Sequence, residues 1–222
     1  MIKTLARSAA AFLLSLPLGA AGMTPAAADE PAVVVLPLAE AVQALPVAAE
    51  TREGYQRTRF KHWIDADHDS CSTRAEVLIA ESRIEPVIEA GCKVTAGLWF
   101  SYYDGATLTD PRGLDIDHMV PLAEAWDSGA AQWTPARREA YANDLDADRS
   151  LVAVTARTNR SKADQDPAQW LPPLTDARCT YAADWVATKL RWRLAVDEPE
   201  RQVLGELSAG CGRQTLEYTP AP

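Results

Sequence analysis

Four cysteines, with no C-x-x-C pair among them, limit the folds open to this chain. They are Cys71, Cys92, Cys179 and Cys211. Disulfides are favoured over a zinc site because zinc ligands usually come in closely spaced pairs. Four cysteines allow three pairings, and the sequence does not fix which one forms. We expect Cys71–Cys92 and Cys179–Cys211, because these partners are neighbours along the chain.

The first 28 residues indicate the compartment in which such disulfides would form. Lys3 and Arg7 precede an apolar run over residues 9–22, and residues 26–28 are all alanine. This is the pattern of a secretory signal peptide with its cleavage site. The run is shorter than the roughly 20 residues that a membrane-spanning helix needs. We therefore expect a secreted, extracellular protein with no membrane span, in surroundings that favour disulfides.

The remaining sequence is typical of one globular domain between two short end segments. Its composition, 47% hydrophobic and 24% charged, excludes a disordered chain and a polytopic membrane protein. Residues 29–50 are expected to be a linker in which part of the chain forms a short helix. Residues 51–211 hold all seven tryptophans and are expected to be the functional domain. Residues 212–222 are expected to be a C-terminal tail.

Short strand and helix signals alternate irregularly, which predicts an α+β fold with small sheets and more helix than strand. Strands are expected over residues 77–80, 93–102, 114–120 and 151–155. Helices are expected over residues 121–128, 136–145 and 181–192, and from Asp197 through Leu207.

The most informative motif is Asp115-Ile116-Asp117-His118-Met119-Val120-Pro121, followed about forty residues later by Asn159-Arg160-Ser161-Lys162. A strand would end in Asp-His before proline, a second strand would follow, and Asn159 would open a helix. In this order of elements the chain resembles the HNH endonuclease superfamily. An Asp-His pair alone would more often be structural than catalytic.

The resemblance is to exported HNH-family proteins related to the C-terminal domain of modification-dependent restriction enzymes, from about Thr51 to Cys211. Around Asn159 the chain is also similar to the HNH domain of RNA-guided CRISPR nucleases. The resemblance implies a ββα-metal core, also called a His-Me finger. It also implies His118 as general base and Asp117 and Asn159 as metal ligands. Such oxygen ligands favour Mg²⁺, with Mn²⁺ as an alternative.

Phosphodiester hydrolysis needs a base to activate water and a cation beside the scissile phosphate. Arg160 and Lys162 follow Asn159 closely, so we expect them to neutralise phosphate charge. The resemblance adds Arg74 as a phosphate contact. Lys162 stands where the name HNH would place histidine, which favours a one-metal site completed by water. The predicted function is metal-dependent hydrolysis of DNA, with RNA as an alternative substrate.

A different function class remains open, a non-catalytic exported calcium-binding module of the cell envelope. Asp65, Asp67, Asp69 and Glu76 follow the ligand spacing of an EF-hand loop. Ser70 stands where that loop normally requires glycine. The formal net charge of −9, which loss of Lys3 and Arg7 would make more negative, also disfavours a polyanionic partner. Local positive surface is expected first at the basic clusters of residues 137–138 and 189–193.

Overall fold

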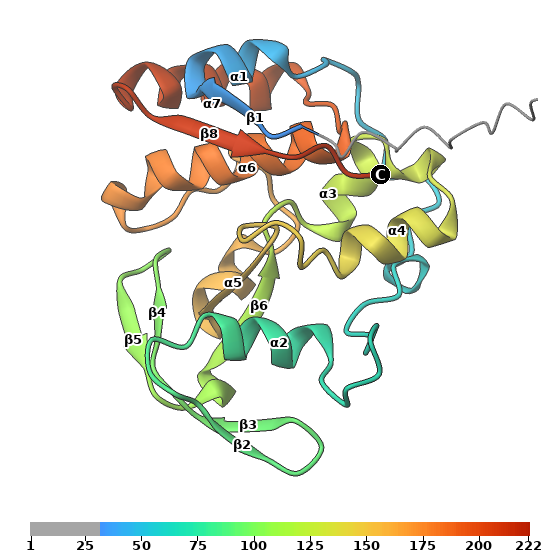
Figure 1. Ribbon diagram of the computed structural model, residues 1–222. Helices are drawn as coiled ribbons and strands as arrows, with labels where there is room; N and C mark the ends of the chain where they lie inside the picture. Colours follow the sequence, from blue (N-terminus) through green and yellow to red (C-terminus); the bar gives the residue numbers. More distant parts are fainter. Residues whose placement is uncertain (1–31) are drawn as a thin grey trace, which may run out of the picture. The chain divides into compact units, whose positions relative to one another are not determined.

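A computed structural model describes residues 32–222 (Figure 1). Asp115–His118 lie on the first of two antiparallel strands, and Asn159–Lys162 lie on the helix that directly follows the second strand. Strand β6 (Leu114–His118) pairs with β7 (Leu151–Thr155), and α5 (Ala156–Lys162) begins at the next residue. Helix α5 contacts both strands. The Thr155 side chain accepts a hydrogen bond from the Thr158 N–H and caps α5. The predicted signal peptide lies outside the described residues.

The other elements surround this unit. The helices are α1 (Leu38–Ala44), α2 (Thr73–Ala80), α3 (Leu122–Asp127), α4 (Pro135–Ala142), α6 (Arg178–Trp192) and α7 (Glu198–Gly210). The strands are β1 (Val34–Pro37), β2 (Val87–Glu89), β3 (Lys93–Ala96), β4 (Trp99–Ser101), β5 (Ala106–Leu108) and β8 (Thr215–Tyr218). Over residues 32–222 every sheet has two antiparallel strands, β1–β8, β2–β3, β4–β5 and β6–β7. The predicted α+β class is confirmed.

The two end segments take part in the fold. Strand β1, from the stretch expected to be a linker, pairs with β8, from the stretch expected to be a tail. Helix α1 packs against α6 and α7, as Figure 1 shows. Leu38, Ala41 and Val42 are buried on one side of α1, so the expected short helix is present. No helix in the described part of the chain is long and apolar enough to cross a membrane.

Both predicted disulfides are present. Cys71 pairs with Cys92, with Cα atoms 5.0 Å apart, and Cys179 pairs with Cys211, at 5.5 Å. The first joins the start of α2 to the β2–β3 hairpin, and the second joins the first turn of α6 to the end of α7. Both bonds therefore hold segments that flank the central strands rather than the motif itself.

Two of the predicted strands differ from the structure. Residues 77–80 are the second half of α2, because the Ser72 side chain caps that helix and Val77 and Leu78 face the core. Residues 93–102 form two strands, β3 and β4, rather than one. The two strands are separated at residues 97–98, and a Cβ added at Gly97 would lie 2.4 Å from the ring of Trp99. The indole of Trp99 therefore leaves room only for glycine at position 97.

Helix α6 is the centre of the larger core. Its apolar stripe includes Tyr181 and Trp185, each completely buried. Helix α7 begins as predicted, because the Asp197 side chain accepts a hydrogen bond from the Glu200 N–H. The Glu200 side chain instead turns inward to Trp185 and Lys189. Asp197 therefore caps α7, while Glu200 makes a buried polar contact.

Candidate active site

A cavity of about 320 Å³ opens where β6 ends and α5 runs past it. Asp117, His118 and Asn159, which the sequence analysis singled out, all line this cavity. Asp117 and His118 are consecutive on a strand and would face opposite sides if the strand were regular. Strand β6 ends at His118, and the chain turns into α3 after Pro121. Both residues line the cavity at this strand end.

The imidazole of His118 is buried and held in one orientation. Its Nε2 lies 2.9 Å from the Ala142 carbonyl oxygen, at the end of α4. A carbonyl only accepts, so Nε2 carries the hydrogen and Nδ1 keeps its lone pair. Burial lowers the pKa of His118 to about 3. The ring is therefore neutral at physiological pH, as a general base must be before it takes a proton.

Aromatic rings surround His118 and restrict its movement. The indole of Trp63 lies 5.3 Å from the imidazole, and the ring of Tyr141 lies 6.4 Å from it in a stacked arrangement. His62 meets His118 edge to face at 6.2 Å. Motif spacing could not reveal these neighbours, because Trp63 and His62 come from a segment more than fifty residues before the motif.

Asp117 is bound from the side that faces the protein interior. Its Oδ2 accepts hydrogen bonds from Lys162 Nζ at 2.6 Å and from the Tyr103 hydroxyl at 2.7 Å. No hydrogen bond within residues 32–222 reaches Oδ1. Burial raises the pKa of Asp117, and the adjacent Lys162 ammonium opposes that rise. One carboxylate oxygen is thus fixed to the protein and the other is left for a ligand.

Lys162 occupies a different position from the one expected for a phosphate contact. Its side chain is completely buried and does not line the cavity. Besides Asp117, its ammonium donates to the carbonyl oxygens of His118 at 3.0 Å and Met119 at 2.9 Å. These bonds fix the turn that follows β6. Lys162 is therefore placed to position Asp117 and His118, and it does not face a substrate.

Asn159 and Arg160 share one partner on β6. Asn159 Nδ2 and Arg160 Nε each lie 3.4 Å from Asp115 Oδ2. Since Nδ2 faces Asp115, the amide oxygen Oδ1 of Asn159 is available, and no hydrogen bond in the described chain reaches it. Arg160 is 75% exposed and lines the cavity. Asp115 thereby orients the amide of Asn159 and holds the guanidinium of Arg160 at the rim of the cavity.

The donor set fits a hard divalent cation. Asp117 Oδ1 and Asn159 Oδ1 are two oxygen ligands without other partners, on residues that line one cavity. Mg²⁺ and Mn²⁺ favour oxygen ligands, and Mg²⁺ usually keeps several waters. Two protein oxygens with water in the remaining positions would make the one-metal site expected from the sequence, and metal binding here stays a prediction.

Other expected contacts lie away from the cavity or inside the protein. Arg74 donates from α2 to the carbonyl oxygens of Leu114 and Pro111, at 3.1 and 3.4 Å, and does not line the cavity. The basic clusters that were expected to supply surface charge are largely internal. Arg138, Lys189 and Arg191 are each at least 94% buried. These side chains therefore pair with internal carboxylates and carbonyl oxygens. Too little of their surface is exposed for contact with a nucleic acid.

Arg57 is a cavity residue that sequence reasoning missed. It lies on a 3₁₀ helix, Arg57–Arg59, and lines the cavity together with His118 and Arg160. Its positive charge is close enough to His118 to help keep that imidazole neutral. Arg57 forms no ion pair among residues 32–222. In the sequence, Arg57 is one of several arginines in a polar stretch, and no motif around it indicates a place in the site.

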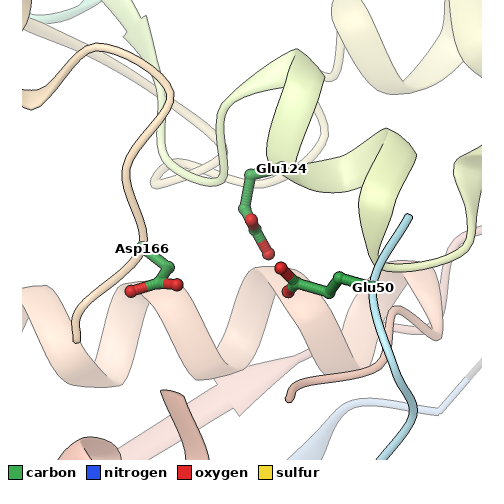
Figure 2. A group of neighbouring side chains, drawn as sticks. All are labelled: Glu50, Glu124 and Asp166. Carbon is green, nitrogen blue, oxygen red and sulfur yellow. The ribbon is translucent and has the colours of Figure 1, made fainter. Parts of the chain in front are cut away.

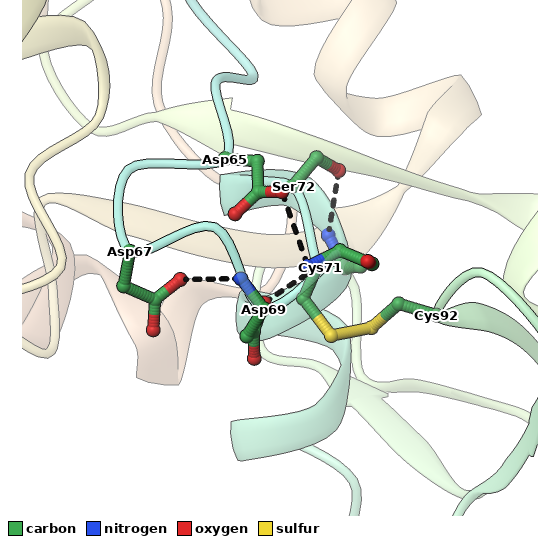
Figure 3. The surroundings of a disulfide bond; sticks show 8 residues. Asp65, Asp67, Asp69, Cys71, Ser72 and Cys92 are labelled. Atoms are coloured by element: carbon green, nitrogen blue, oxygen red, sulfur yellow. Dashed lines mark hydrogen bonds between the residues drawn. A yellow bond between two sulfur atoms is a disulfide. The ribbon is translucent and has the colours of Figure 1, made fainter.

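The predicted calcium loop brings its acidic residues together beside the first disulfide (Figure 3). Asp65, Asp67 and Asp69 each offer a carboxylate oxygen within 4.8 Å of the others. Burial, followed by the charges of these three aspartates, raises the pKa of Glu76. Ser70 adopts a φ of 80°, the conformation for which glycine is preferred. The three aspartates are thus grouped, and calcium binding, with Glu76 as a further ligand, stays a prediction.

The family model for the C-terminal domain of GmrSD restriction endonucleases matches residues 73–207. The chain belongs to this family. The matched region contains β6, β7 and α5, and with them Asp117, His118 and Asn159. The resemblance to the C-terminal domain of restriction enzymes is confirmed.

A second comparison concerns a protein of Arthroderma benhamiae described as an uncharacterized secreted protein. It is 41% identical to this chain over 160 residues, which cover 72% of this chain and 77% of that protein. The secreted relative agrees with the export signal that the sequence predicts. No solved structure matches the chain.

Proposed function

We propose that this member of the GmrSD C-terminal family is a secreted, metal-dependent endonuclease that hydrolyses phosphodiester bonds of DNA. In this proposal β6, β7 and α5 are a ββα-metal core. The observation that carries the proposal is that His118, Asp117 and Asn159, from two separate motifs, line one cavity. Family membership supports the same function class, since the family is named for restriction endonucleases.

His118 is the general base in this mechanism. Its Nδ1 takes a proton from the attacking water, and the developing positive charge is shared through Nε2–H with the Ala142 carbonyl. A divalent cation held by Asp117 Oδ1 and Asn159 Oδ1 would polarise the phosphate and stabilise the departing oxygen. Arg160 and Arg57 offset charge on the non-bridging oxygens. Lys162 keeps Asp117 and the end of β6 in place.

A substrate panel tests this proposal. Supercoiled plasmid, single-stranded DNA and RNA are incubated with the oxidised mature protein in Mg²⁺. We expect cleavage of DNA at many positions. Faster cleavage of RNA than of DNA would support the same mechanism, with RNA as the substrate. A folded protein that cleaves none of the three substrates in Mg²⁺ would contradict the proposal.

Replacement of Asn159 by alanine is expected to raise the Mg²⁺ concentration needed for half-maximal cleavage. Loss of even an indirect metal contact typically costs 10- to 100-fold in metal affinity, so we expect a rise of at least about tenfold. The measurement is a Mg²⁺ titration of plasmid cleavage. Arg157→Ala, on the exposed side of the same helix, is the matched control and should leave the titration midpoint unchanged. An unchanged midpoint in Asn159→Ala would remove Asn159 from the site.

Replacement of Arg57 by alanine is expected to weaken DNA binding roughly tenfold, about 1.4 kcal/mol. It should also reduce the salt dependence of binding by about one phosphate contact. The measurement is binding of a labelled duplex at several salt concentrations. Arg59→Ala is the matched control, because Arg59 lies on the same 3₁₀ helix but packs over Trp126, 5.4 Å from the ring centroid. Equal salt slopes for both variants would contradict a phosphate contact at Arg57.

The calcium-binding module is retained as a second candidate because Asp65 Oδ1 is buried without a hydrogen-bond partner beside Asp67 and Asp69. If the loop binds Ca²⁺, calcium should raise the melting temperature, and Asp67→Ala should abolish that part of the rise. Asp110→Ala, at an exposed aspartate elsewhere, is the control. Calcium stabilisation through this loop without any nuclease activity would favour the second candidate over the first.

A further inference from the structure

The bend at residues 61–64 brings two side chains to the general base of the proposed mechanism. The indole of Trp63 lies 5.3 Å from the imidazole of His118, and the ring of His62 lies 6.2 Å from it. Trp63 has a φ of 60°, in the left-handed region that a bulky residue rarely adopts. Such a conformation persists only where surrounding contacts hold it, and it is most frequent at functional sites. The contacts that hold the bend therefore bear on the geometry of the site.

The side-chain amide of Asn143 holds both ends of the bend. Its Nδ2 donates to the Lys61 carbonyl oxygen at 2.8 Å, and its Oδ1 accepts from the Ile64 N–H at 3.1 Å. Nδ2 also donates to the Glu139 carbonyl oxygen at 2.7 Å, and the Thr73 hydroxyl donates to Oδ1 at 2.9 Å. The amide thus uses both of its donors and both acceptor positions within the protein.

Asn143 also follows directly on the residue that holds the edge of the His118 ring. It comes at the end of α4, after Ala142, whose carbonyl oxygen accepts the hydrogen bond from His118 Nε2. One point of the chain therefore fixes the imidazole twice, through this carbonyl and, by way of the bend, through Trp63. A single hydrogen bond leaves a ring free to turn about it, whereas an indole packed against the ring restricts that rotation. Displacement of a reacting group by about 1 Å can cost roughly a hundredfold in rate.

The segment that leads to the bend is anchored independently of Asn143. At its start, Figure 2 shows the carboxyl group of Glu50 pointing toward that of Glu124 on α3. Further along, the Trp126 indole donates to the Glu53 carbonyl oxygen at 3.1 Å. Loss of the Asn143 bonds should therefore loosen the bend and leave the rest of the segment in place.

We propose that Asn143 is a positioning residue of the active site, which keeps Trp63 against His118 by holding the bend at residues 61–64. Asn143 does not line the cavity, so it acts through these two rings rather than on the substrate. The catalytic consequence rests on the proposed function, whereas the placement of Trp63 rests on the geometry alone.

The first test reads the position of His118 without any measurement of activity. Asn143→Asp keeps the shape of the side chain but puts an oxygen where Nδ2 donates to two carbonyl oxygens. NMR signals of the imidazole protons report ring placement, because nearby aromatic rings shift them, and the chain holds three histidines. We expect the His118 signals, assigned with His118→Ala, to move in Asn143→Asp and in Trp63→Leu. Ser208→Ala, which removes a hydroxyl bond to Gly205 on α7, is the control and should leave them in place.

The second test separates orientation of the base from binding. At saturating DNA and Mg²⁺, the single-turnover rate of Asn143→Asp should fall at least about tenfold. Its Mg²⁺ midpoint and its affinity for DNA should stay within about twofold of the parent's. Trp63→Leu should lose a similar factor, and Trp63→Phe, which keeps a ring beside His118, should recover most of the rate. In a His118→Ala background Asn143→Asp should cause no further loss, since residues that act as a unit are not additive.

His118 signals that stay in place in Asn143→Asp would overturn the proposal, whether or not the protein cleaves nucleic acid. A rate loss of the same size in the His118→Ala background, or in Ser208→Ala, would make Asn143 a purely structural residue and would also overturn it. If Asn143→Asp does not fold, Trp63→Leu decides, and a rate equal to the parent's would contradict the role of the bend. A parent that cleaves no substrate, with His118 signals that move as expected, would refute the proposed function and still support the placement of the ring by Asn143.

Discussion

A His118→Ala variant is expected to lose plasmid cleavage while it keeps its fold. A positioned general base contributes about 10²- to 10⁴-fold to a rate, and the free Nδ1 of His118 is placed for that role by the bond between Nε2 and Ala142. We expect the cleavage rate at saturating Mg²⁺ to fall by at least about a hundredfold. The measurement is single-turnover cleavage, with near-UV circular dichroism to establish that the fold is retained.

His62→Ala is the matched control for this loss. His62 is the nearest other imidazole, 6.2 Å from the ring of His118, but it does not line the cavity. Its removal should change the rate only severalfold. A fully active and correctly folded His118→Ala variant, or equal losses in the two variants, would contradict the assignment of His118 as the base.

A Lys162→Met variant is expected to be the most strongly destabilised single substitution near the site. It leaves the Asp117 carboxylate buried without its cation and removes the donor to the His118 and Met119 carbonyls. Breaking a buried ion pair from one side typically costs about 3–5 kcal/mol of unfolding free energy. Chemical unfolding of the oxidised protein, followed by tryptophan fluorescence, measures this loss.

Two variants keep this prediction testable if Lys162→Met does not fold. The double variant Asp117→Asn with Lys162→Met removes the unpaired charge and should recover part of the stability. Lys61→Met is the matched control, because Lys61 pairs with Glu139 on the surface and is 70% exposed. Its substitution should change the unfolding free energy by less than about 1 kcal/mol. A Lys162→Met variant as stable as Lys61→Met would contradict the positioning role.

The sequence was sufficient to locate His118, Asp117 and Asn159, because each lies in a contiguous motif at the end of a strand or on the helix after it. It was not sufficient to assign Lys162. Three residues beyond Asn159 on a helix, a lysine can face solvent or the strands beneath. Packing of α5 against β6 and the Tyr103–Asp117 contact decide between these directions, and both are tertiary.

The same contrast between local sequence pattern and tertiary packing explains why one element of the fold was predicted wrongly. The apolar run at residues 77–80 was predicted as a strand, since a short apolar run does not distinguish a buried strand from a buried helix turn. The Ser72 cap and the burial of Val77 and Leu78 make it a helix. Arg57 was missed for another reason. It reaches the cavity from a segment far away in the sequence, and no local pattern records that approach.

The most direct test of the central claim is the metal dependence of plasmid cleavage by the oxidised mature protein. The account predicts that EDTA abolishes cleavage and that excess Mg²⁺ restores it along a saturable curve, with Mn²⁺ able to substitute. Cleavage that persists unchanged in EDTA would contradict the metal-dependent mechanism. No cleavage in Mg²⁺, Mn²⁺ or Ca²⁺, by protein shown to be folded and oxidised, would contradict the assignment as a nuclease.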